Sequence, residues 1–251
     1  CDKFCKFCVV PYTRGPEHSR NFNEILNEAD KLISNGSKEL ILLGQNVNAY
    51  NDKNKHLSDI IYALEKKRDL LRIRYYTSHP KDMSKDLFEA HKDCTKLMPL
   101  LHLPVQSGSD AILKSMNRKH SIKEYFEIIN TLKEKNPKIK FASDFIIAYP
   151  GEKDDDFNKT CELMENIKFI NSYSFIYSPR PGTPASEMNM IDEKLAKKRL
   201  VIFQNIAEKI KLNYKKQLLN QTVHVLFENR MKKEKDKYFG RDKYQNPVIV
   251  H

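Results

Sequence analysis

The sequence has no long apolar run. Its longest apolar stretches, such as Leu40–Leu43, have the length of a strand, whereas a membrane-spanning helix needs about 20 consecutive apolar residues. Only 40% of the 251 residues are apolar and 31% are charged, against about 45–50% and 25% in typical globular domains. Internal repeats and low-complexity linkers are absent. These absences exclude an integral membrane protein, a collagen and a coiled coil, and predict a polar, soluble chain long enough to bury a core.

Cysteine is scarce and its number is odd. Five cysteines cannot all pair, which excludes a fully disulfide-bonded mini-protein. Cys1, Cys5 and Cys8 lie within eight residues, a spacing typical of metal sites in a reducing compartment. The sequence carries no signal or transit peptide, so we expect a cytoplasmic protein without a membrane partner. Because residue 1 is a cysteine of this motif and not methionine, we expect a piece of a longer protein.

Positive charge is in excess. Lysine and arginine number 44 against 33 aspartates and glutamates, a net charge of +11, which suits a polyanion such as nucleic acid. Many lysines, as in Glu65–Arg68, are equally consistent with solvated helix faces, so charge alone leaves this partner open. The candidates for phosphate contacts, each also consistent with a solvated surface, are Arg14, Arg20, Arg118, Lys119 and Arg180.

Short apolar runs alternate with longer amphipathic segments. The expected strands are Glu39–Leu43, Leu71–Tyr76, Leu100–Val105, Phe141–Ile147 and Ser172–Tyr177. Because these runs do not alternate clearly, we expect both of their faces to be covered. The expected helices between them are Asn23–Ser34, Leu57–Lys67, Ser84–His91, Ser121–Lys135 and Asp154–Asn166. Ser84 and Ser121 are N-cap candidates, Glu124 completes a capping box, and Gly36 ends the first helix.

This alternation predicts an α/β fold with parallel strands, in the form of a partial parallel β/α barrel. One further strand is expected before Cys1. A long basic helix, Asp192–Leu219, follows, and then a β-rich segment with Val223–Phe227, Gly240 and Pro247–Val250. We expect two domains, the barrel over residues 1–215 and an incomplete small β-barrel over residues 216–251.

The N-terminal cysteines have the spacing C-x₃-C-x₂-C. Structural zinc sites usually have four ligands, and His18, Cys94 and Cys161 are not placed nearby in the sequence. Three thiolates on a [4Fe–4S] cluster would leave one iron open for another ligand. The spacing favours such a cluster, while a zinc site completed by a remote residue, or buried cysteines without a metal, remain alternatives.

The motif and several other segments resemble the radical S-adenosylmethionine (SAM) enzymes, and among them the methylthiotransferases. The segments that carry this resemblance are Cys8–Gly15, Leu42–Val47, Thr77–Pro80, Leu101–Asp110, Ser143–Ile146, Pro150–Glu152 and Ser178–Ala185. Val9–Thr13 and Ser178–Pro181 favour the branch that acts on dimethylallyladenosine in tRNA. Sister branches act on threonylcarbamoyl-adenosine in tRNA or on a ribosomal protein, and they remain alternatives.

The resemblance implies a chemistry. Cys1, Cys5 and Cys8 would hold the cluster, and SAM would bind its open iron. A radical formed from SAM would remove hydrogen from C2 of the adenine beside the anticodon, sulfur would be inserted there, and a second SAM would methylate it. No side chain is expected to be catalytic, because the radical forms on the cofactor. The resemblance also implies a second [4Fe–4S] cluster in an upstream domain, a tRNA anticodon stem-loop as substrate, and a TRAM-like RNA-binding module at residues 216–251.

Polar and small residues follow the expected strands, where active sites of β/α barrels lie. The resemblance implies that the SAM site includes Phe7, Gly44, Gln45, Ser78, Gln106, Ser107, Gly151 and Glu152. Turn chemistry or helix capping explains each of these residues equally well. The candidate contacts to RNA are Arg14, Arg20 and Arg180.

Other residues have plainer interpretations. We expect His79 and His102 to be turn or core histidines and not metal ligands, and Cys94 and Cys161 to be inert buried thiols. The aromatic residues Tyr173, Phe175 and Tyr177 are expected to be strand core and not a platform for stacked bases. The alternative from another class of protein is a non-catalytic RNA-binding protein with zinc at its N-terminus.

Overall fold

The computed structural model describes residues 1–232, 234 and 236–251. Its central strands are β1 (Glu39–Leu42), β4 (Arg72–Tyr75), β5 (Leu100–His102), β6 (Lys140–Ile147) and β7 (Asn171–Ile176). The helices between them are α3 (Leu57–Glu65), α4 (Lys85–Asp93), α5 (Asp110–Ser115), α6 (Ile122–Lys135) and α7 (Asp154–Ile167), while α1 (Val10–Arg14) and α2 (Phe22–Ser34) precede β1. The predicted α/β class is confirmed, and every predicted strand and helix of this region is present.

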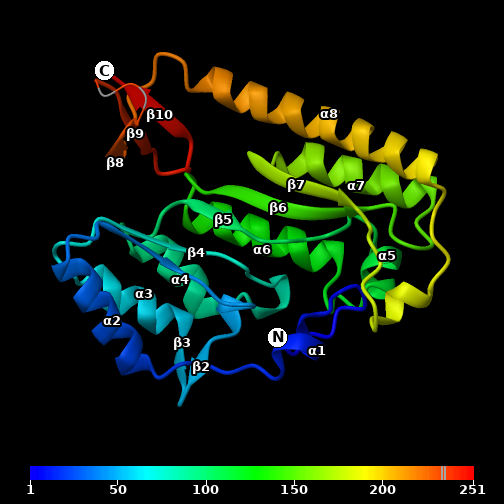
Figure 1. Cartoon of the computed structure of the whole chain (residues 1–251), viewed down its shortest axis with the longest axis horizontal. Helices are drawn as coiled ribbons and strands as arrows, with labels where there is room; N and C mark the ends of the chain where they lie inside the picture. Colours follow the sequence, from blue (N-terminus) through cyan, green and yellow to red (C-terminus); the bar gives the residue numbers. More distant parts are fainter. Residues whose placement is uncertain (233, 235) are drawn as a thin grey trace.

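The central strands run parallel. β1 pairs with β4, and β5, β6 and β7 pair in that order. The two sheets meet where Ile73 of β4 forms a bridge with Leu97, just before β5. Together they form one curved surface, with helices on its outside (Figure 1). This is the predicted partial barrel.

Local signals set the helix boundaries. The Ser84 hydroxyl accepts a hydrogen bond from the Leu87 amide at the start of α4. Ser121 and Glu124 form the predicted capping box of α6, and each such cap contributes about 1 kcal/mol to helix stability. Gly36, with φ of +96°, follows α2, where a left-handed residue ends the helix.

β5 is shorter than predicted. The expected strand ran from Leu100 to Val105, but β5 ends at His102. Pro104 has no amide hydrogen to donate to a sheet. Gln106 rejoins the neighbouring strand through a bridge with Phe145, and its amide donates to the Asp144 carbonyl at 3.0 Å. The interruption leaves a short loop at the end of this strand.

The main core lies between the outer face of the strands and the helices. Phe145 of β6 packs with Phe169 and with Phe203, with ring centroids 5.5 and 4.7 Å apart. All three rings are fully buried. Phe203 belongs to α8 (Glu193–Gln217), the long helix that crosses the outside of β7 and α7 (Figure 1). Its burial fixes α8 to the barrel.

The inner face of the strands is not fully covered, contrary to the prediction. Tyr173 and Phe175 of β7 are 57% and 62% exposed, and Ile41 and Leu43 at β1 are also exposed. The absence of clear alternation in a strand sequence predicts apolar residues on both faces. It does not predict whether other side chains reach the inner face of a barrel.

A small antiparallel sheet follows α8. It contains β8 (Leu226–Arg230), β9 (Tyr238–Arg241) and β10 (Pro247–Val250), in the order β10, β9, β8. The prediction of a strand over Val223–Phe227 was placed too early. The His224 carbonyl accepts a hydrogen bond from Arg72 at 3.1 Å, so this part of the segment contacts the barrel and does not enter the sheet.

Two buried arginines hold this sheet against the barrel. Arg72 donates to the carbonyls of Arg241 and Asp242, and Arg74 donates to those of Asp242 and Lys243, at 2.8–3.2 Å. Both arginines lie in β4. The domain boundary between residues 215 and 216 stays a prediction, and residues 233 and 235 of the second domain lie outside the described residues.

Short elements complete the fold. They are the 3₁₀ turns η1 (Val47–Ala49), η2 (Pro80–Asp82) and η3 (Pro184–Glu187), and the hairpin strands β2 (Asn51–Asp52) and β3 (Lys55–His56). Within the residues that the structure describes, none of the helices has both the length and the apolar composition needed to cross a bilayer.

Candidate active site at the cysteine loop

The N-terminal loop lies against segments that follow the strands. The Lys6 amide donates to the Met116 carbonyl at 2.9 Å, and the Ala185 amide donates to the Lys6 carbonyl at 3.0 Å. The Asn117 amide group donates to the Phe4 carbonyl at 2.8 Å. The segments that hold the loop are thus far away in the sequence, and they place it at the carboxyl ends of the strands, where β/α barrels carry their active sites.

Side chains add a further anchor. The Lys3 ammonium group lies 2.7 Å from the Asp82 carboxylate, which also accepts from the Asn46 amide group at 2.7 Å. Gln45 lines the same hollow as Cys1. Lys3 and Asp82 are mostly buried, so this ion pair is screened less than a surface pair. The loop is therefore held at Lys3 as well as at Phe4 and Lys6.

The three cysteines are free thiols in the part of the chain that the structure describes. The Cys8 amide donates to the Cys5 carbonyl at 2.9 Å, a turn that brings the backbones of these two residues close together. Cys5 is only 7% exposed, while Cys1 and Cys8 are half-buried. Unpaired, partly accessible cysteines on a fixed loop are suitable ligands for iron or zinc.

Arg118 contacts this loop through its guanidinium. Its guanidinium donates to the Cys5 sulfur at 3.6 Å and also to the Pro104 carbonyl. Its side chain is buried, so the interpretation of Arg118 as a solvated residue was wrong, while its contact with phosphate stays a prediction. The buried guanidinium thus lies against the sulfur of a predicted cluster ligand. Sequence reasoning missed this contact, because it depends on how the loop packs. Lys119, by contrast, is exposed as a solvated residue would be.

Within the described residues, no three side chains of His, Cys, Asp or Glu converge closely enough to hold a metal ion. A [4Fe–4S] cluster is larger than an ion and separates its cysteine ligands more widely. Free cysteines on one loop, with Cys5 beside a buried guanidinium, fit such a cluster, whose ligation by Cys1, Cys5 and Cys8 stays a prediction.

Unusual backbone conformations occur where three strands end near this loop. Thr77 after β4, Gln106 after β5 and Ala148 after β6 have φ of 62°, 77° and 57°. Residues other than glycine rarely adopt this left-handed region, and such residues cluster at functional sites. The Thr77 hydroxyl donates to the Gly44 carbonyl. It ties the end of β4 to the segment after β1.

The predicted SAM-site residues differ in accessibility. Gly44 and Gln45 are exposed beside Cys1, and Gly151 is exposed in a turn with φ of +85°. Ser78 is buried, and its hydroxyl has no hydrogen-bond partner among the described residues. A buried hydroxyl without a partner is uncommon. The Ser78 hydroxyl is therefore suited to form a hydrogen bond with a polar group of a ligand. Gln106 is also buried, at 9% exposure.

Two other predicted SAM-site residues have structural contacts of their own. The Ser107 hydroxyl lies 3.3 Å from that of Thr160 and accepts from the Ser109 amide at 3.2 Å. Phe7 packs on a small cluster that contains Tyr149. The structure thus brings Phe7 and Ser107 near the site, but their side chains contribute to packing.

Glu152 is almost fully buried. Its carboxylate accepts from the Ala148 amide at 3.1 Å and from Arg199 of α8 at 2.9 Å. Burial raises the pKa of Glu152 to about 7, although Arg199 and the Ala148 amide both oppose that shift. Glu152 therefore fixes the turn around Gly151, which leaves the neighbouring backbone available to a ligand.

The candidate RNA contacts are exposed. Arg14, Arg20 and Arg180 all lie at the surface, and Arg20 forms an ion pair of 2.6 Å with Glu28. Arg14 and Arg20 line a hollow of about 350 Å³ that also contains Cys1, Gly44 and Gln45. The structure brings these two arginines to the cysteine loop, whereas Arg180 is not part of that hollow.

The histidines behind the loop are uncharged at neutral pH. Burial, with the charge of Arg118, lowers the pKa of His79 to about 2 and that of His120 to about 4. Their rings meet edge to face, 5.7 Å apart. The His79 ring accepts from the Lys81 amide at 3.1 Å, which makes it the turn histidine that was predicted. His102 instead pairs with Asp144 at 2.9 Å.

The remaining cysteines were predicted to be inert buried thiols, and Cys94 is buried whereas Cys161 is only half-buried. Cys94 ends α4 and Cys161 lies in α7. Burial raises the pKa of Cys94 to about 12 and that of Cys161 to about 11. Both thiols stay protonated at neutral pH, and a protonated thiol is a poor nucleophile and metal ligand.

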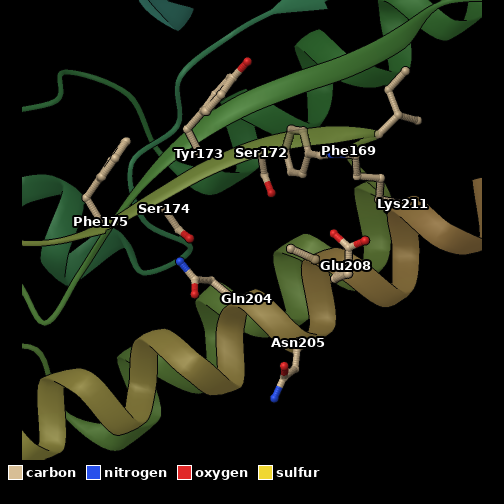
Figure 2. Close-up of a pocket in the computed structure, with 11 residues that line it drawn as sticks. Phe169, Ser172, Tyr173, Ser174, Phe175, Gln204, Asn205, Glu208 and Lys211 are labelled. Carbon is tan, nitrogen blue, oxygen red and sulfur yellow. The ribbon is translucent and has the colours of Figure 1, made fainter. Parts of the chain in front are cut away.

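The aromatic residues of β7 were predicted to be core, which is wrong for Tyr173 and Phe175 and correct for the buried Tyr177. Figure 2 shows the rings of Tyr173 and Phe175 on the side of β7 that faces away from α8. Ser172 and Ser174 lie on the other side, beside a hollow of about 460 Å³ between β7 and α8. This hollow has no part of the cysteine loop in its lining.

Comparison with known proteins places these features in a family. Residues 1–164 match the model of the radical SAM superfamily. The chain is 55% identical over 253 residues to the tRNA-2-methylthio-N(6)-dimethylallyladenosine synthase of Pelagibacter ubique, covering 99% of this chain and 56% of that protein. It is 47% identical over 255 residues to the protein of the same name from Wolbachia sp. subsp. Brugia malayi, covering 100% of this chain and 58% of that protein.

The fold agrees with that match. The structure superposes on coproporphyrinogen III oxidase from Escherichia coli, described as a radical SAM enzyme, with a TM-score of 0.60 at 14% identity, covering 97% of this chain and 64% of that chain. The chain spans a little over half the length of the two curated relatives. The family match over most of the barrel shows that this chain belongs to the radical SAM superfamily of enzymes, whose cofactors are S-adenosylmethionine and a [4Fe–4S] cluster.

Proposed function

We propose that the protein to which this chain belongs transfers a methylthio group to C2 of N6-dimethylallyladenosine beside the anticodon of tRNA. The observation that carries this proposal is the 55% identity, over 99% of the chain, to a protein named for that reaction. The motif segments that resemble methylthiotransferases are spread over the same length. Because the relatives are longer than this chain, the activity is assigned to the whole protein.

In this proposal, Cys1, Cys5 and Cys8 are the cluster ligands, and Arg118 packs against the Cys5 sulfur. The cluster, when bound, supplies the electron that splits SAM and the coordination position that holds its amino and carboxylate groups. The chain itself must hold both cofactors in one geometry and exclude water. The anchors at Met116, Ala185 and Asp82 support that role of the loop.

The SAM site is proposed to lie over the ends of the strands. Gly44, Gln45, Ser78 and Gln106 offer backbone or side-chain polar groups there, and Gly151 allows close approach of the backbone to the ligand. Phe7, Ser107 and Glu152 belong to the same site. Ser107 and Glu152 act on it by fixing their loops through Thr160 and Arg199.

The tRNA is proposed to be held by phosphate contacts from Arg14, Arg20 and Arg180. Residues 216–251 would form the start of a TRAM-like RNA-binding module after a barrel of residues 1–215, and the net charge of +11 suits such a partner. A second [4Fe–4S] cluster belongs to this reaction and is expected outside residues 1–251. Free cysteines and a tRNA substrate both favour the cytoplasm.

The experiment is nucleoside analysis of tRNA. The gene for the whole protein is expressed in a bacterial strain that has dimethylallyladenosine in tRNA but lacks the methylthio modification. We expect the 2-methylthio derivative to appear, and we expect it to be absent when Cys5 is changed to alanine. Modification of threonylcarbamoyl-adenosine alone, or of a ribosomal protein, would assign the chain to a sister branch, and no modification at all would refute the proposal.

A further inference from the structure

Aromatic and polar side chains from separate strands meet on the inner face of the barrel. Tyr76 follows β4, His102 ends β5, Asp144 lies in β6 and Tyr173 lies in β7. The ring of His102 lies edge-on to Tyr76 at 6.3 Å and to Tyr173 at 6.2 Å, measured between ring centroids. These residues, with Phe175, are called the inner-face cluster below.

The strand register places the apolar part of the cluster. In the parallel pairing of β6 with β7, Asp144 is opposite Tyr173 and Ile146 is opposite Phe175. Tyr173 and Phe175 are two residues apart, so their rings share one face of the strand, the face turned away from α8 (Figure 2). At 57% and 62% exposure, these adjacent rings present an apolar surface that would gain from burial.

The polar residues of the cluster can form further hydrogen bonds. The His102 ring and the Asp144 carboxylate bind each other at 2.9 Å, and in the described part of the chain neither side chain has another hydrogen-bond partner. The Tyr76 hydroxyl is buried and has no hydrogen-bond partner among the described residues. A buried polar group usually has a partner, so these groups are suited to a ligand with several polar atoms.

Positive and negative charges lie around the inner-face cluster, but only the negative charge of Asp144 belongs to it. Arg74 is buried, and its guanidinium binds main-chain carbonyls of the small sheet and lies 3.1 Å from the Glu39 carboxylate. That pairing balances its charge. The Asp144 carboxylate is partly exposed beside Tyr173. The inner face is therefore suited to a neutral ligand and disfavours an anionic one.

We propose that the inner-face cluster binds the alkylated purine of the substrate and selects it over related bases. Tyr173 and Phe175 bury the five-carbon dimethylallyl group, and the His102–Asp144 pair and Tyr76 hydrogen-bond the polar edge of the purine. Asp144 repels a base that carries a carboxylate, such as threonylcarbamoyl-adenine. This inference rests on the proposed function and assigns residues that determine specificity.

Aromatic contacts of this kind are well suited to a nucleobase. Stacking on an aromatic side chain contributes substantially to the affinity for each base, whatever its sequence context. A polar group of the site that is left without a partner in the complex disfavours a base that lacks the matching group. The apolar rings and the polar pair therefore recognise different parts of the same ligand.

The test is equilibrium binding of three anticodon stem-loop RNAs to the full-length holoenzyme, with fluorescence anisotropy as the readout. The RNAs carry adenosine, dimethylallyladenosine or threonylcarbamoyl-adenosine at the same position. We expect the wild type to bind the dimethylallyl RNA roughly tenfold more tightly than the unmodified one. We expect Phe175→Ala and Tyr173→Ala to lose most of this preference, and Tyr173→Phe, which keeps the ring, to retain it.

Ser174→Ala is the matched control, because Ser174 lies in the same strand but on the side of α8 (Figure 2). We expect this variant to keep the wild-type preference. Asp144→Asn should relax the rejection of the threonylcarbamoyl RNA. Cluster content and thermal unfolding of each variant show whether it has folded, and affinity for the unmodified RNA should stay within about twofold, since phosphate contacts dominate it.

If the wild type prefers the dimethylallyl RNA and the Tyr173→Ala and Phe175→Ala variants prefer it equally, the inner-face cluster is not the base site, while the proposed function stands. If the wild type binds all three RNAs equally, or prefers the threonylcarbamoyl RNA, the proposed function fails and this inference fails with it.

Discussion

The carboxylate of Glu152 and the guanidinium of Arg199 form an ion pair of 2.9 Å in which the two side chains are 1% and 5% exposed. Glu152 follows the end of β6, and Arg199 lies in α8. The pair thus joins the turn at the edge of the candidate SAM site to the long outer helix. Arg199 also contacts the exposed Asp154 at 2.6 Å, so one guanidinium holds both ends of this turn.

Loss of Arg199 should destabilise the protein strongly. In Arg199→Met, Glu152 would remain buried without its counter-ion, and removing one partner of a buried pair costs about 3–5 kcal/mol. Equilibrium urea unfolding at pH 8 measures this loss. The control is Lys197→Met, because the Lys197–Glu193 pair is 66% and 78% exposed and such pairs contribute about 1 kcal/mol or less. Equal effects of the two substitutions would contradict the account.

The raised pKa of Glu152 predicts a pH dependence of stability. Burial raises this pKa from 4.5 to about 7, so between these values the folded state holds a proton that the unfolded state has lost. The stability contributed by that proton is complete below about pH 4.5 and disappears as the pH rises through about 7. The free energy of unfolding of the wild type, relative to Glu152→Gln, should therefore fall by about 1–3 kcal/mol between pH 5 and pH 8. A flat or rising difference would show that Glu152 is already ionised at pH 5.

Most of the secondary structure could be predicted from the sequence, because its signals are local. The apolar run Phe141–Ile147 predicted β6 to within one residue, and Ser121 with Glu124 predicted the start of α6. The helix α5 was missed, since its 6 residues are too few for a periodic pattern. The start of β8 was misplaced because a contact with Arg72, a residue far away in the sequence, sets it.

Gly108 is required by a close approach of two backbones. A Cβ atom at this position would lie 2.6 Å from Thr160 Cα and would clash with the Lys159 carbonyl of α7. Gly108→Ala should therefore cost about 3 kcal/mol of stability, since neither backbone can move away easily. Thermal or urea unfolding measures the cost. Gly44→Ala is the control, because its nearest contact would be an ordinary 3.5 Å to Val47; if both variants were equally stable, the packing of Gly108 on α7 would be wrong.

Arg74 should hold the small C-terminal sheet on the barrel. In Arg74→Met, the carbonyls of Asp242 and Lys243 lose charged donors, and each such hydrogen bond contributes about 1.5–3 kcal/mol. We expect amide hydrogen exchange in β9 and β10 to speed up at least about tenfold, with β6 unchanged. Arg230→Ala, which removes an exposed contact to Tyr238 within the same sheet, should have little effect. Unchanged exchange in Arg74→Met would mean that the sheet is held by other contacts.

The candidate site could be predicted only in part. The spacing of Cys1, Cys5 and Cys8 is visible in the sequence, as are the polar residues after the strands. The burial of Arg118 beside Cys5 is not, because it depends on loops joined across the barrel. Likewise, the sequence of β7 does not show that Tyr173 and Phe175 lie on an uncovered face, because no local signal reports what packs against a strand.

The most direct test of the account is Mössbauer spectroscopy of the full-length protein, reconstituted without oxygen, before and after addition of SAM, in the wild type and in Cys5→Ala. The account predicts a [4Fe–4S] cluster in which one iron changes its signal when SAM binds, and the loss of that signal, but not of any second cluster, in Cys5→Ala. Cys161→Ala, which changes an inert thiol, should keep it. A wild-type protein that carries one equivalent of tetrahedral zinc at Cys1, Cys5 and Cys8, and no iron signal that responds to SAM, would contradict it.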